Sequence, residues 1–166
     1  MARMTTAVVV GVHALATLHA SSASAQDAPR RGVTQSERAF FNAAMAYVDS
    51  ANDAAHVLSR AIADAITPTE TIRALDRARQ LENAVYNSVY ARRTKGAVPA
   101  GWDDVAKTVE TSHRLFQSGT SELEAAWKGQ DLPHVNTGLW TLERAAAARM
   151  TTGTEAHARW RALVAS

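Results

Sequence analysis

The stretch MTTGTEAHARWRALV, residues 150–164, decides the predicted fold. Together with the residues before it, it carries an apolar series in which the steps alternate between three and four positions. Such spacing places side chains on one face of a helix. We therefore predict a long helix whose apolar stripe faces the core and is covered by the rest of the chain. The stripe consists of Leu139, Leu142, Ala146, Met150, Gly153, His157, Trp160 and Val164.

Three further helices are predicted from start and stop signals. Thr34–Glu37 and Thr67–Glu70 both have the Thr-x-x-Glu form of a capping box, and Pro68 stands at a first helical position, where its missing N–H costs nothing. Gly96 and Gly129 mark helix ends. The predicted core positions are Phe41, Ala44, Val48, Ala51, Ala55, Leu58, Ile62 and Ala65 in the first helix; Ile72, Leu75, Ala78, Leu81, Val85 and Val89 in the second; and Trp102, Val105, Val109, Ser112, Phe116, Gly119, Leu123 and Ala126 in the third.

Four long helices with short connections predict an all-α fold, an up-down-up-down antiparallel four-helix bundle over residues 36–166. No stretch alternates apolar and polar residues in the manner of a strand. Two other arrangements remain open: a three-helix packing with a broken fourth helix, and a dimer of helical hairpins. Gly153 is the position at which the last helix would break.

Composition excludes several classes of function. The 166-residue chain is long enough for one domain, and its formal net charge of +2 gives no strong field for nucleic acid. It contains no cysteine, which excludes disulfides, thiolate metal sites, iron–sulfur clusters and covalent c-type haem attachment.

Residues 1–25 have the form of a secretory signal. Arg3 gives a positive start, Ala7–Leu18 is apolar, and Ala23-Ser24-Ala25 is a cleavage site of the A-x-A type. We expect residues 26–35 to form a polar, disordered leader. We expect a periplasmic or secreted protein with no membrane span after cleavage, the alternative being a retained N-terminal anchor.

No metal site or catalytic group is predicted. Neither a nucleophile turn nor a phosphate-binding glycine loop is present. The only metal-like pattern is the i, i+3 pairing of carboxylate and histidine found in di-iron bundles, but the predicted faces and depths of these residues differ. They are read as solvated polar faces: Asp53 with His56, Glu110 with His113, and the separate Glu82 and Glu143.

His157 is the remaining candidate. A histidine on an apolar stripe is ordinarily a core residue with a hydrogen-bond partner. Here Gly153 lies one turn earlier and leaves space, and Met45 lies at the matching depth on the first helix. A thioether and an imidazole that face each other across a gap are able to ligate haem iron.

At this point the chain resembles the soluble periplasmic four-helix-bundle b-type cytochromes. The likeness rests on Thr151-Thr152, His157 and Arg159-Trp160-Arg161, plus one methionine early in the first helix. The resemblance implies haem b held without covalent links, with Met45 and His157 as axial ligands. Arg92 and Arg159, from a basic cluster at the same bundle end, would meet the propionates. The chain departs from that family in its longer helices and in Gly153.

The resulting prediction is an exported, non-enzymatic four-helix bundle, monomer or homodimer, that binds a ligand or a protein partner. The haem-binding electron carrier is the specific alternative, and a periplasmic interaction or chaperone-like scaffold is another. A ligand binder should have a core void near Gly153, whereas an interaction protein should expose an apolar patch. The basic cluster Arg92, Arg93, Lys95, Arg159 and Arg161 either stabilises helix ends or recognises an acidic ligand.

Overall fold

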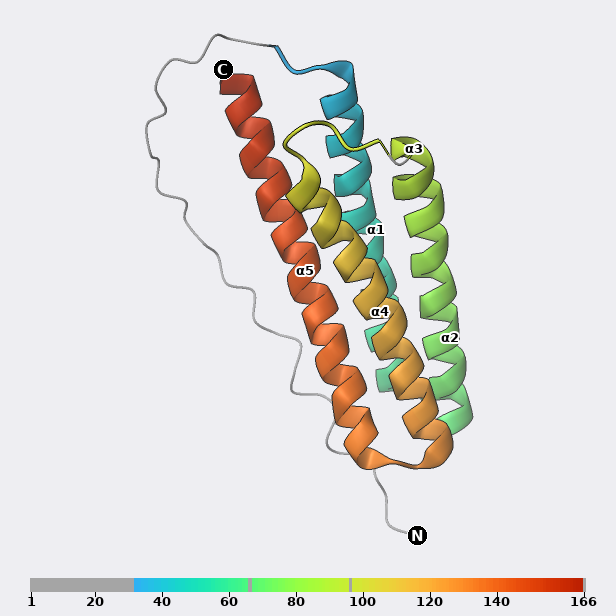
Figure 1. The fold of residues 1–166 in the computed structure, drawn as a ribbon. Coiled ribbons are helices and arrows are strands. Elements are labelled where there is room, and N and C mark those ends of the chain that lie inside the picture. The colour runs from blue at the N-terminus through green and yellow to red at the C-terminus, as the bar shows by residue number, and fades with distance from the viewer. Residues whose placement is uncertain (1–31, 66, 96, 166) are drawn as a thin grey trace.

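The computed structural model describes residues 32–65, 67–95 and 97–165, apart from the side chains of Arg92 and Leu132. Within these ranges the chain is all-helical and contains no strand. Its four long helical segments lie side by side (Figure 1). The predicted signal, and the leader up to residue 31, lie outside the described residues. The elements are α1 (Gln35–Asp64), α2 (Pro68–Val85), the π-helix η1 (Tyr86–Ala91), α3 (Arg92–Thr94), α4 (Asp103–Gly129) and α5 (Leu132–Ala165).

Both predicted capping boxes are confirmed. The Thr34 hydroxyl accepts a hydrogen bond from the Glu37 backbone N–H at 3.2 Å, and the Glu37 carboxylate accepts one from the Thr34 N–H at 2.9 Å. The same exchange links Thr67 and Glu70 at the start of α2. Each box satisfies orphan backbone donors, which fixes where α1 and α2 begin.

The second helix differs from the prediction in its backbone. It runs as an α-helix to Val85 and then widens into η1 before the short α3. Insertions of this π type inside α-helices are uncommon and frequently accompany functional sites. Lys95, with φ at 51°, ends the helical segment in the left-handed conformation.

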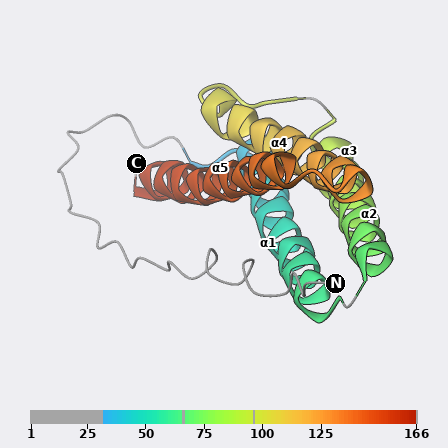
Figure 2. The same cartoon turned by 90° about the horizontal axis from the view of Figure 1, so that it is seen from below.

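The tightest helix pair is α4 and α5. A Cβ atom added at Gly138 would stand 2.7 Å from Leu123 Cγ and 2.9 Å from the Leu123 backbone nitrogen. One added at Gly119 would stand 2.9 Å from Leu142 Cγ. The backbones of α4 and α5 are therefore so close at Gly119 and Gly138 that a residue with a Cβ atom would clash there. Seen from below, α5 runs alongside α4, and α1 diverges from α5 toward the C-terminal end of α1 (Figure 2).

The predicted face of α5 is wrong by one residue, whereas the predicted core face of α4 is confirmed at all eight positions. Met150, His157 and Val164 of the predicted stripe are exposed. Each buried position lies one residue earlier than a predicted one, and α5 continues unbroken through Gly153. The buried face consists of Gly138, Thr141, Ala145, Arg149, Thr152 and Ala156.

Small residues explain this change of face. Gly, Ala and Thr allow α5 to approach α4, which a row of Met, His and Trp side chains would prevent. The hydroxyls of Thr141 and Thr152 each donate to the backbone oxygen four residues earlier, so their burial leaves no donor unsatisfied.

The core divides into two apolar clusters. One surrounds Phe40, Tyr47 and Trp102 near the start of α1 and α4, and the other surrounds Leu75, Phe116 and Leu123 toward the opposite end. No helix in the described ranges is long and apolar enough to cross a membrane.

Candidate functional site

His157 lies against Phe41 of α1, and Met45 packs on the apolar cluster that Phe41 also borders. The His157 ring lies 5.4 Å from the Phe41 ring in an edge-on arrangement, and Trp160 stacks on Phe41 at 4.6 Å. Met45 is half-buried and lies one helical turn after Phe41 on α1. The imidazole of His157 is exposed, so its predicted place inside the core is wrong.

The remaining predictions for this site have mixed outcomes. Arg159 is half-exposed and forms an ion pair with Asp104 on α4, with Nη2 3.0 Å from Oδ2. The side chain of Arg92 lies outside the described residues. Gly153 is not a core void, because a Cβ atom placed on it meets nothing within 4 Å and its neighbours Met150 and His157 are exposed.

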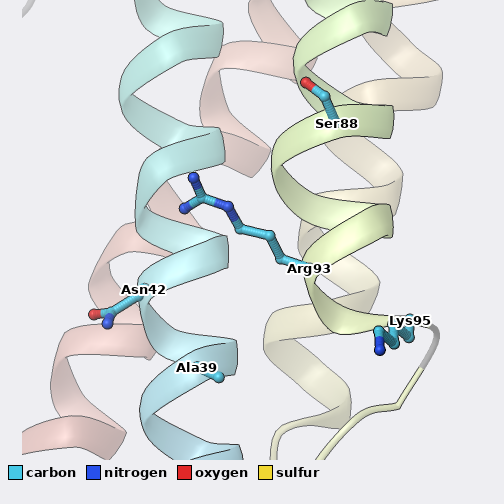
Figure 3. A pocket seen from close by; sticks show the side chains of 5 residues that line it. All are labelled: Ala39, Asn42, Ser88, Arg93 and Lys95. Atoms are coloured by element: carbon cyan, nitrogen blue, oxygen red, sulfur yellow. The ribbon is translucent and has the colours of Figure 1, made fainter.

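A surface groove lies between α1 and the η1–α3 segment. Its volume is about 650 Å³, and it is lined by Ala39 and Asn42 of α1 together with Ser88, Arg93 and Lys95. Figure 3 shows the Arg93 side chain extending from its own helix toward α1, across the space between the two. We call this the α1–η1 groove.

The α1–η1 groove is electropositive. Two of its lining residues are cations, and no carboxylate from the described part of the chain lines it. Among the described residues, neither Arg93 nor Lys95 takes part in an ion pair. The Ser88 hydroxyl donates to the Ala84 backbone oxygen at 2.6 Å, so its proton is already used. Asn42, Arg93 and Lys95 are therefore the side chains able to donate hydrogen bonds to a bound anion.

A second constellation is buried between the two apolar clusters. Glu82 of α2 is fully buried, and its carboxylate oxygens face three donors. The Tyr47 hydroxyl lies 2.7 Å from Oε1, the Gln117 amide 2.7 Å from Oε2, and His113 Nδ1 2.8 Å from Oε2. Such contacts suit an ionised carboxylate, which accepts at both oxygens.

Tyrosine rings lie next to the partners of this carboxylate. The Tyr86 ring, in η1, stacks on the His113 imidazole with centroids 3.8 Å apart. Burial, together with the charge on Glu82, raises the pKa of the Tyr47 hydroxyl far above its usual range, so the phenol stays a donor. Burial raises the pKa of Tyr90 in the same way.

Arg149 brings a positive charge into the same layer. The side chain is 3% exposed, its Nε donates to Asn52 Oδ1 at 3.1 Å, and its guanidinium lies 5.7 Å from the Phe116 ring. Burial lowers the pKa of Arg149, and its electrostatic interactions with Tyr47 and Glu82 oppose that shift. Its Nη1 atom is buried without a hydrogen-bond partner in the described part of the chain.

We call Tyr47, Glu82, Ser112, His113, Gln117 and Arg149 the polar layer. Every oxygen of Glu82 has a partner and none is exposed, so the layer offers no open position for a reacting molecule. Its role is to connect helices: the Ser112 hydroxyl, for example, donates to the Ala145 backbone oxygen of α5 at 3.2 Å.

The predicted second helix places Leu81 in the core, yet Leu81 is 41% exposed and Glu82 takes the buried position. The spacing itself allows this, because Thr71, Leu75, Ala78 and Glu82 continue the alternation of four, three and four. The prediction chose Leu81 over the adjacent Glu82 because leucine is the more hydrophobic residue, and that choice was wrong. No sequence signal distinguishes a buried glutamate from an exposed one until its partners are known.

The carboxylate–histidine pairs of the di-iron pattern are separated. Asp53 and His56 are exposed on α1, and Glu143 is exposed on α5, whereas Glu82 and His113 meet in the core. Among the described residues, no group of three or more metal-binding side chains comes together. Comparison with known proteins gave no match to a family model, to a curated protein or to a solved structure.

Proposed function

We propose that the protein is an exported, non-enzymatic four-helix bundle that binds a small anionic ligand in the α1–η1 groove. The observation that carries this proposal is the lining of the groove, in which the described residues supply two cations without ion-pair partners and no carboxylate. Its volume lies within the range of small-molecule sites, roughly 300–1,000 Å³. The proposal also includes an up-down-up-down order of the four helices and cleavage of the secretory signal after Ala25. Mass spectrometry of exported protein that finds Met1 retained would contradict the cleavage.

The chemistry favours a ligand with two acidic groups. Arg93 offers a planar fork suited to a carboxylate or phosphate, whereas Lys95 acts as a point charge. The Asn42 amide adds a neutral donor. The alternative role for these cations is to oppose the negative end of the η1–α3 segment, and that role requires no ligand.

Calorimetric titration separates the two roles. The probes are inorganic phosphate, acetate, succinate and citrate, tested on wild type and on Arg93→Gln and Lys95→Gln. A charged hydrogen bond contributes roughly 1.5–3 kcal/mol, so each variant should bind the dianionic or trianionic probes roughly 10- to 100-fold more weakly. The control is Arg60→Gln, which removes an exposed cation of α1 away from the groove. If no probe binds, or if both variants bind like wild type, the proposal is wrong.

Haem binding is a second candidate, favoured by the arrangement around Phe41. An exposed imidazole is free to accept a metal, and Met45 packs on the apolar cluster that Phe41, the neighbour of His157, also borders. A bound haem would supply one-electron chemistry. Haemin titration should produce a Soret band that His157→Ala abolishes, while His134→Ala, an exposed histidine elsewhere on α5, leaves it unchanged. An identical band in both variants would exclude His157 as a ligand.

A further inference from the structure

The outer face of α5 carries a second regular series of residues. Its members alternate by three and four positions over 25 residues, from Trp140 to Val164, and every one of them is exposed. Three are large hydrophobic residues, with exposures of 57%, 65% and 64% for Trp140, Met150 and Val164. This spacing is a heptad seam of the kind that pairs helices. The series, called the outer α5 series, is Trp140, Glu143, Ala147, Met150, Thr154, His157, Arg161 and Val164.

The outer α5 series is complementary to itself in the reverse direction. When two copies of α5 are placed antiparallel and centred on Thr152, each member of the series lies opposite another member. The acidic residue then meets a basic one and larger side chains meet smaller ones. The pairs are Trp140 with Val164, Glu143 with Arg161, Ala147 with His157, and Met150 with Thr154.

We propose that two copies of this chain pair through the outer α5 series as an antiparallel, two-fold symmetric dimer. The charged residues Glu143 and Arg161 favour the antiparallel direction of the two helices. A parallel pair would place Glu143 opposite Glu143 and Arg161 opposite Arg161, whereas the antiparallel pair forms the Glu143–Arg161 contact twice. The spacing of 3.5 residues keeps such a seam in contact as the helices coil around each other.

The composition of the contact sets its strength. Twenty-five helical residues span roughly 36 Å, but only three of the eight residues in the series are large and hydrophobic, so the contact lacks the continuous apolar seam of a stable coiled coil. The dimer therefore dissociates on dilution, and the protein is a mixture of monomer and dimer at intermediate concentrations.

Charge reversal tests the pairing in solution. Glu143→Arg and Arg161→Glu each place like charges opposite one another in a homodimer, so each alone should self-associate at least about tenfold more weakly than wild type. An equimolar mixture of the two variants restores opposite charges and should associate like wild type in sedimentation-velocity runs. Both positions are exposed, and circular dichroism confirms that each variant is folded.

Cysteine cross-linking tests the direction independently, because the chain has no cysteine of its own. Under oxidation, a mixture of Glu143→Cys and Arg161→Cys proteins should give mainly the mixed cross-linked dimer, and each variant alone should give little. Arg60→Cys, on α1, is the control that should not cross-link. A wild type that stays monomeric at millimolar concentration, or cross-linking within each variant and not between them, would overturn the proposal.

Discussion

Glu82 places a carboxylate where water does not reach, and its neighbours compensate for that burial. Tyr47, His113 and Gln117 direct donors at the carboxylate, and Arg149 supplies positive charge in the same layer. Removing water from an ion costs several kcal/mol unless such partners replace it. Each partner comes from a helix other than α2, so the carboxylate ties the helices together.

The titration of the three tyrosines of the chain offers a test of this burial, because Tyr86 and Tyr90 lie next to Tyr47. Tyr47, Tyr86 and Tyr90 all have raised pKa values, with burial as the largest cause. A phenol whose folded pKa exceeds its unfolded pKa, about 10, stabilises the fold below that pH and loses this contribution as the pH rises above it. We therefore expect stability to fall above pH ~10, with tyrosinate absorbance appearing together with loss of helix.

Tyr47→Phe tests this assignment, since it removes the most strongly shifted phenol. Its alkaline unfolding should begin at higher pH than that of wild type and should release two tyrosinates. An early, gradual tyrosinate signal from fully helical protein would show that the three phenols are solvated.

At the scale of the element, α5 shows how far helix periodicity predicts structure. The periods, capping boxes and stop signals predict the helices and the three main breaks between them, and they predict the buried face of α4. They fail on α5, where two faces one residue apart have the same three-and-four spacing. Hydrophobicity favours the face with Met150, whereas close packing against α4 requires the face with Gly138.

The candidate site was predictable only in part, for the same physical reason. Arg93 and Lys95 were identified as members of a basic cluster, because consecutive charges after a helix are visible in sequence. Asn42 and Ser88 were not, since their place in the groove depends on how α1 lies against η1. Likewise, the burial of Glu82 depends on donors from α1 and α4.

Two glycines of α5 give a matched pair of substitutions. Gly138→Ala forces a Cβ atom against the Leu123 backbone, so it should destabilise the fold by about 1–3 kcal/mol. Gly153→Ala meets open space and should stabilise it by roughly 0.5–1 kcal/mol, because alanine loses less conformational freedom in a helix. Urea denaturation measures both. Equal effects at the two positions would mean that α4 and α5 are less closely packed than described.

At the scale of the whole molecule, the polar layer separates two apolar clusters. Phe40 and Trp102 belong to the first and Leu75 and Phe116 to the second, with Tyr47, Glu82 and Arg149 contributing polar groups between them. An apolar interior alone tolerates sliding of helices past one another by a turn. A charged layer penalises such sliding, because a shifted helix would leave a buried charge without its partners. We infer that the layer sets the register of the bundle.

A double-mutant cycle on Glu82 and Arg149 tests this role. Glu82→Met leaves its buried donors and the guanidinium without the carboxylate, and Arg149→Met leaves the carboxylate without its nearby cation, so each should destabilise the fold by about 1–3 kcal/mol. The double variant removes both charges together and should cost clearly less than the sum of the two, with a coupling of about 1–3 kcal/mol measured by urea denaturation. The control cycle uses Asp104 and Arg159, an ion pair in contact with solvent, for which coupling near zero is expected. Additive losses at Glu82 and Arg149 would show that the two charges act separately. The register would then be set by the small-residue contact of α4 and α5, and not by the polar layer.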